Sequence, residues 1–88
     1  MSEKRKTIDL DTKYSLPKEY HIIDFKDKIL IVAPECFNYI VLNNEIQKEI
    51  YLSLYNSTIQ EVLDKFKGEE NNVKVVITQI EAKSFVEN

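Results

Sequence analysis

Glycine, proline, cysteine, histidine and tryptophan are almost missing from this chain. Its 88 residues include one Gly, two Pro, one Cys, one His and no Trp. One glycine excludes a Gly-rich phosphate-binding loop and favours long regular elements. A lone Cys36 excludes an internal disulfide and a cysteine metal cluster, and a buried structural thiol is the expected role. His21 lies in a strand pattern, where a packed or half-exposed side chain is a better expectation than a general base.

A surplus of charge and a long apolar run are also missing. Twelve Lys and Arg residues against fifteen Asp and Glu residues give a net charge of −3. Nucleic-acid binders usually carry a basic surplus, so no nucleic-acid partner is expected. No apolar run approaches the roughly 18 residues of a membrane-spanning helix, and the N-terminus has no apolar signal-peptide region. We therefore expect a cytoplasmic protein that makes no contact with a membrane.

Side chains that could hold a metal or perform catalysis do not cluster. The adjacent carboxylates of Glu69 and Glu70 suit a solvated loop, and no group of His, Cys and acidic residues has the spacing of a metal site. The sequence predicts no catalytic residues, no metal and no cofactor, and catalysis by this chain alone is not expected.

The length fits one small domain. Residues 1–19 open with a charged run and predict a flexible N-terminal segment, with a short extra strand over 7–11 as an alternative. Residues 20–88 form the predicted domain. Within it, three stretches predict strands. Residues 20–25 place His21, Ile23 and Phe25 on one face, residues 29–33 are nearly all apolar and β-branched, and residues 37–42 are a third such stretch. Short connections make them an antiparallel meander, with Pro34 ending the middle strand.

The strand over 37–42 is the most informative stretch. Phe37, Tyr39 and Val41 alternate with Asn38, Ile40 and Leu42, and five of these six residues are aromatic or aliphatic. This composition is typical of a strand covered on both faces. As an outer strand of the meander, it also has open backbone groups.

After Asn43 the apolar period changes to that of helices, which are predicted near 44–55, 58–67 and 72–86. Asn44 with Gln47, and Thr58 with Glu61, have the spacing of capping boxes, although Asn43 is an alternative first cap. Gly68 suits the end of the second helix. On the third helix, Val73, Ile77, Ile80 and Ser84 lie on one face, which is mostly apolar, and a weaker apolar stripe runs through Val75, Ala82 and Val86. The predicted core contains Ile31, Ile46, Ile50, Ile59, Leu63, Ile77 and Ile80. Three strands followed by three helices define an α+β domain.

The third strand ends in Leu42 and Asn43, and Thr58, Ile59 and Glu61 form a threonine turn into the next helix. The first helix has an aliphatic stripe, and the last helix is led by a valine; these positions are Ile46, Ile50, Leu54, Val73, Ile77 and Ile80. With these motifs, residues 20–86 resemble the PqqD-like family, the RiPP recognition elements of peptide-modifying systems in natural product biosynthesis. The chain departs from the family where Asn56 and Ser57 replace a glycine, and where Val76 stands in place of an acidic residue.

The resemblance implies a winged helix-turn-helix-like domain that binds the leader of a ribosomally made precursor peptide and catalyses nothing. The leader adds as a strand beside the third strand, in a groove closed by the last helix. The expected partners are the precursor peptide and a modifying enzyme, such as a radical SAM protein, fused or separate. Carried to this sequence, the expected peptide-binding residues are Asn38, Tyr39, Ile40, Val41, Leu42, Val76, Gln79, Ile80 and Lys83.

Two other interpretations remain open from the sequence. One is a winged-helix DNA-binding module, in which residues 58–67 would be the recognition helix and carry Lys65 and Lys67. The other is a plain protein-interaction or dimerisation domain. Independently of these, the outer strand could be covered by residues 7–11 or by a second copy of the chain instead of a peptide.

Overall fold

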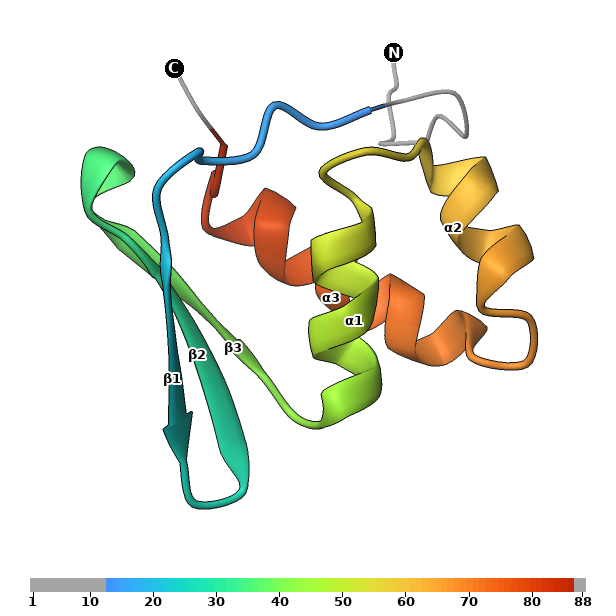
Figure 1. The fold of residues 1–88 in the computed structure, drawn as a ribbon, viewed down its shortest axis with the longest axis horizontal. Helices are drawn as coiled ribbons and strands as arrows, with labels where there is room; N and C mark the ends of the chain where they lie inside the picture. Colours follow the sequence, from blue (N-terminus) through green and yellow to red (C-terminus); the bar gives the residue numbers. More distant parts are fainter. Residues whose placement is uncertain (1–12, 87–88) are drawn as a thin grey trace, which may run out of the picture.

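The computed structural model describes residues 13–86, apart from the side chain of Cys36. The elements follow one another as three strands and then three helices, with a short 3-10 helix before the last strand (Figure 1). They are β1 (His21–Phe25), β2 (Lys28–Ala33), η1 (Pro34–Cys36), β3 (Asn38–Leu42), α1 (Glu45–Ser53), α2 (Ile59–Lys65) and α3 (Glu70–Ala82). The predicted α+β class and element order are confirmed. The predicted strand over 7–11 lies outside the described residues.

The sheet has the order β1-β2-β3, with both pairs antiparallel. Ile31 in the middle of β2 lies opposite Ile22 on one side and Ile40 on the other. β2 is therefore central, as predicted, and β1 and β3 are the two outer strands. β3 is the strand nearest the helices (Figure 1).

Phe37 does not belong to β3, contrary to the prediction that the strand begins there. It ends η1 with a left-handed backbone, φ 52° and ψ 42°, and its N–H donates to the Pro34 carbonyl. Its side chain is 94% exposed. Pro34 fixes its own backbone angle and favours a tight turn, and the chain leaves this turn only after Phe37.

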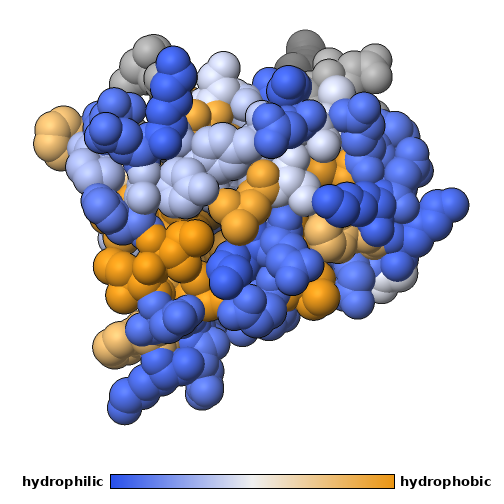
Figure 2. Space-filling model, in the orientation of Figure 1, coloured by the Kyte–Doolittle hydropathy of each residue, from blue (hydrophilic) through white to orange (hydrophobic). Residues whose placement is uncertain are grey.

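Helices cover only one face of the sheet, so the expectation that β3 is covered on both faces is wrong for this chain alone. Ile31, Ile40 and Leu42 face the helices and are fully buried. Tyr39 lies on the opposite face and is 44% exposed. On β1 every residue is exposed, including Ile23 and Phe25. Figure 2 shows apolar surface over the sheet in this view.

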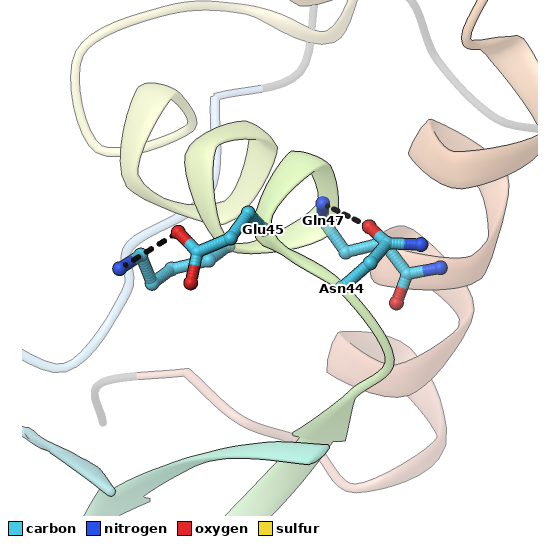
Figure 3. Close-up of polar contacts among 4 residues, drawn as sticks. Asn44, Glu45 and Gln47 are labelled. Carbon is cyan, nitrogen blue, oxygen red and sulfur yellow. Dashed lines mark hydrogen bonds and ion pairs between the residues drawn. The ribbon is translucent and has the colours of Figure 1, made fainter. Parts of the chain in front are cut away.

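α1 begins where the sequence predicts. Asn44 is the N-cap, and its side-chain oxygen accepts the N–H of Gln47 at 2.8 Å (Figure 3). The reciprocal half of the capping box is absent, because the Gln47 side-chain oxygen reaches one residue further back, to the N–H of Asn43 at 2.8 Å. Glu45 and Lys48 form an ion pair at 3.1 Å on the exposed side of this turn.

The other predicted cap is complete. The Thr58 hydroxyl accepts the N–H of Glu61 at 3.2 Å, and the Glu61 carboxylate accepts the N–H of Thr58 at 2.8 Å. Gly68 has φ 88°, a conformation that favours glycine, and it connects α2 to α3.

α3 is displaced relative to its prediction. It begins at Glu70, so the polar stretch predicted as a loop up to Asn72 forms its first turn. It ends at Ala82, so Ser84 and Val86 are not on the helix. Ser84 has φ 50°, which ends the helical path.

The core lies between the sheet, α1 and α3. Of the predicted core residues, Ile31, Ile50, Ile59, Ile77 and Ile80 are buried, whereas Ile46 and Leu63 are only partly buried. Tyr51 and Phe85 are the largest fully buried side chains, and their rings are 6.1 Å apart.

Part of the predicted flexible segment is packed against the helices. Leu16 is 4% exposed and belongs to the core. The Tyr14 hydroxyl donates to the Glu81 carboxylate on α3 at 2.7 Å, and the Tyr55 hydroxyl donates to the Pro17 carbonyl. The chain from Tyr14 to Pro17 therefore belongs to the folded domain, which the polar composition around it did not indicate.

Candidate functional site

The predicted peptide-binding residues meet where β3 runs beside the second half of α3. The two elements pack against each other, and the C-terminal end of α3 reaches the start of β3 (Figure 1). We call the exposed side of this contact the β3–α3 edge and define it by Tyr39, Val41, Gln79 and Lys83. All four belong to the expected peptide-binding residues: Tyr39 and Val41 were predicted on the third strand, and Gln79 and Lys83 on the last helix.

The backbone N–H groups of β3 alternate in direction, and their hydrogen-bond partners show which of them point away from β2. The N–H of Tyr39 donates to the Asn38 side-chain oxygen at 2.9 Å, and the N–H of Val41 to the Gln79 side-chain oxygen at 3.5 Å. Neither N–H therefore pairs with β2. Since successive residues of a strand alternate, the N–H of Ile40 points toward β2. Tyr39 and Val41 are thus the residues of β3 that offer main-chain groups outward.

Lys83 and Tyr39 close one end of the β3–α3 edge. The Lys83 ammonium lies 4.3 Å from the centre of the Tyr39 ring, a cation–π distance. The Asn38 side-chain amide donates to the Lys83 carbonyl, which ties the start of β3 to the end of α3. The edge therefore combines an aromatic ring, a positive charge and two outward residues of a strand.

Four of the predicted site residues are buried. Ile40 and Leu42 on β3, and Val76 and Ile80 on α3, are each 0% exposed. Val76 and Ile80 were predicted to line the wall of a groove, but in this structure their side chains fill the core beneath β3. Gln79 on α3 and Lys83, the residue that caps the C-terminal end of α3, are half-buried and reach the edge.

The described residues outside the β3–α3 edge offer few features that suggest another kind of site. Among the described side chains, no group of three His, Cys, Asp or Glu residues is arranged to hold a metal ion. His21 is exposed on β1. Two surface hollows lie away from the β3–α3 edge: one is lined by Lys18, Glu19, Tyr20 and His21, the other by the β1–β2 hairpin and the start of α1. None of the helices within residues 13–86 is long and apolar enough to cross a membrane.

Comparison of the chain with protein-family models, curated proteins and solved structures gave no match. The case for a function therefore depends on the residues and geometry of the chain itself.

Sequence reasoning missed the role of Gln47 at this site. Its side chain is 3% exposed and forms two hydrogen bonds: the oxygen accepts the N–H of Asn43, and the nitrogen donates to the Asn72 oxygen at 2.9 Å. This fixes the point where β3 ends. The capping-box spacing indicated Gln47, but it did not indicate a partner on α3.

Proposed function

We propose that this chain is a non-catalytic peptide-binding domain that receives the leader of a ribosomally synthesised precursor peptide as a strand added beside β3. The partner that follows is a peptide-modifying enzyme, fused or separate, with the cytoplasm as the place of action. The radical SAM class is one such enzyme. The chain itself needs no cofactor for this role.

The observation that carries the proposal is the direction of the main-chain groups of Tyr39 and Val41. Both lie on an outer strand and point away from β2, and in an antiparallel pair a residue of this kind exchanges both its N–H and its C=O with the neighbouring strand. An outer strand with outward groups is the requirement for peptide binding by β-strand addition.

The surroundings of the edge support a peptide with mixed side chains. Alternate residues of an added strand would face the outer surface of the sheet, where Tyr39 is 44% exposed. The positive charge of Lys83 favours an acidic residue near the Tyr39 end, although an exposed pair of this kind adds only about 0–1 kcal/mol. Most of the affinity must then come from main-chain hydrogen bonds and apolar contact. For so short an interface we expect a dissociation constant on the order of micromolar, about −8 kcal/mol.

The test uses peptides encoded by short reading frames next to the gene. Isotope-labelled protein is titrated with each synthetic peptide, and the amide signals are followed. We expect the largest shifts within β3, centred on Tyr39 and Val41. Shifts centred on α2 would point to the helix-turn-helix surface instead, and a gel shift with duplex DNA at low salt then tests the DNA-binding alternative.

A further inference from the structure

The outward N–H groups of the β3 side are already occupied by side-chain oxygens of the same chain. The N–H of Tyr39 is taken by Asn38, that of Val41 by Gln79, and that of Asn43 by Gln47. These donors recur at every second residue, which is the spacing at which a neighbouring strand would supply its carbonyl oxygens. Three side-chain amides therefore stand where the carbonyl groups of an added strand would be.

The three side chains differ in how firmly they are held. Gln47 is buried, and its nitrogen is bonded to Asn72, which in turn donates to Glu69 at 2.6 Å. A buried amide with both ends paired is costly to move. The N–H of Asn43 is thus firmly held by Gln47, and this sets one limit of the usable edge.

Gln79 is held weakly by comparison. Its side chain is half-buried, its bond to Val41 is long at 3.5 Å, and it forms no further hydrogen bond with any described residue. Hydrogen bonds at this length are near the limit of a favourable geometry. Asn38 is also half-buried, at the start of β3, and is bonded to Tyr39 and Lys83. The left-handed turn at Phe37 sets the second limit of the edge.

We propose that Gln79 closes the β3 edge at Val41 in the free protein and must swing away for a peptide strand to add. This inference rests on the proposed function and deepens it, because it states what the peptide displaces. The edge between Phe37 and Asn43 then offers only Tyr39 and Val41, which allows at most about four main-chain hydrogen bonds to the peptide. The closure also protects the free protein, since an open outer strand tends to pair with other chains.

The first part of the test needs no peptide. Amide hydrogen exchange is measured by NMR in the wild-type protein and in Gln79→Ala. Loss of the side-chain acceptor should accelerate exchange of the Val41 amide, by about fivefold if the bond contributes on the order of 1 kcal/mol. The amide of Leu42, which points toward β2, serves as the internal reference and should not change.

Two matched variants control for a general loosening of the fold. Gln79→Glu keeps a side-chain oxygen at the same position and should exchange like the wild-type protein. Gln60→Ala removes an exposed glutamine on α2, whose side chain donates to Asp64 at 3.2 Å, and should also leave the Val41 amide unchanged. If the Val41 amide exchanges at the wild-type rate in Gln79→Ala, Gln79 does not close the β3 edge.

The second part uses a peptide selected on the wild-type protein from a displayed library of short random peptides. If Gln79 must leave before the strand adds, Gln79→Ala should bind that peptide more tightly, by about two- to tenfold for one hydrogen bond. Equal or weaker binding would overturn the displacement step. If the peptide instead shifts amide signals on α2, or if no peptide can be selected, the proposed function is wrong. The exchange measurement tests the contact between Gln79 and Val41 separately.

Discussion

The N–H of Phe85 donates to the carbonyl of Ile80 at 2.9 Å, across the end of α3. The N–H of Ser84 bonds to the Glu81 carbonyl at 3.3 Å, and Ser84 has φ 50°. These bonds define a Schellman motif with Ser84 at the left-handed position that glycine usually occupies. The motif turns the chain so that Phe85 enters the core, and it leaves the Lys83 carbonyl facing Asn38.

Ser84→Gly should therefore stabilise the protein. Glycine adopts a positive φ without the steric cost that a serine carries there. The left-handed conformation costs about 1–2 kcal/mol, and the extra backbone entropy of glycine in the unfolded chain offsets about 0.5–1 kcal/mol of this. We expect a net increase in the free energy of unfolding of about 0.5–1 kcal/mol, which for a chain of this size raises the thermal midpoint by several degrees. Thermal unfolding followed by circular dichroism measures this. Ser53→Gly, at the last residue of α1, is the matched control and should not stabilise; equal gains in both variants would contradict the assignment.

Ile50 and Ile46 provide a matched pair for the core. Both lie on α1, but Ile50 is 0% exposed and Ile46 is only partly buried. Ile50→Ala should lower the free energy of unfolding by about 2–5 kcal/mol, and Ile46→Ala should cost clearly less. Urea unfolding of both variants measures the difference. Equal costs would mean that α1 turns a different face to the core.

Gln47 should be important for stability although it is polar. Gln47→Leu removes the acceptor of the Asn43 N–H and the donor to Asn72 while it keeps a similar volume. Both hydrogen bonds are only partly buried, and their loss should cost about 1–2 kcal/mol in total. Gln60→Leu on the exposed side of α2 is the control and should stay within about 0.5 kcal/mol of the wild-type value. A neutral Gln47→Leu in urea unfolding would show that water can replace both bonds.

Tyr14 should make the stability of the domain sensitive to alkaline pH. Burial raises the pKa of the Tyr14 hydroxyl well above its ordinary value of 10.0, and the hydrogen bond to Glu81 and the charge of that carboxylate add to the increase. The folded protein thus holds this proton more tightly than the unfolded chain does. The stabilisation is complete below about pH 10 and is lost as the pH rises above that value.

Tyr14→Phe should lower the free energy of unfolding at neutral pH by about 1 kcal/mol or less and should lose less stability between about pH 8 and about pH 11. Urea unfolding at both pH values measures this. Glu81→Gln keeps an acceptor but removes the charge, and should give an intermediate pH dependence. A pH dependence of Tyr14→Phe equal to that of the wild-type protein would mean that another group is responsible.

The class of fold and the positions of the strands follow from the sequence because each depends on local periodicity. The strands over 20–25 and 29–33 are found within one residue of their predicted limits, and the capping pair of Thr58 and Glu61 forms as its spacing predicts. These features need only a repeat of two or 3.6, or a fixed separation along the chain.

What the sequence did not predict depends on contacts between distant residues. Phe37 and Ser84 have left-handed backbone conformations. Phenylalanine and serine rarely adopt a positive φ, so their presence in the sequence did not predict these two turns. The full burial of Val76 and the half-buried position of Gln79 depend on how α3 rotates against β3, and the two apolar stripes of the predicted helix left that rotation open. The direction of the β3 N–H groups could be determined only from their hydrogen-bond partners in the structure. The strand pattern shows that these groups alternate, but it does not show which of the two sets points outward.

The direction of these N–H groups allows a direct test of strand addition with two neighbouring proline substitutions. Proline has no N–H and is tolerated in a sheet only where no ladder bond is needed. The N–H of Ile40 points toward β2, so Ile40→Pro should disrupt the sheet and unfold the domain. The N–H of Val41 points outward to Gln79, so Val41→Pro should keep the fold, with a moderate loss of stability, and should remove a donor from the β3–α3 edge.

Circular dichroism and thermal unfolding distinguish the two variants. Titration of Val41→Pro with the library-selected peptide should show at least about a tenfold loss of affinity, because the proline ring also obstructs the added strand. If folded Val41→Pro binds that peptide as tightly as the wild-type protein, the peptide does not pair with β3.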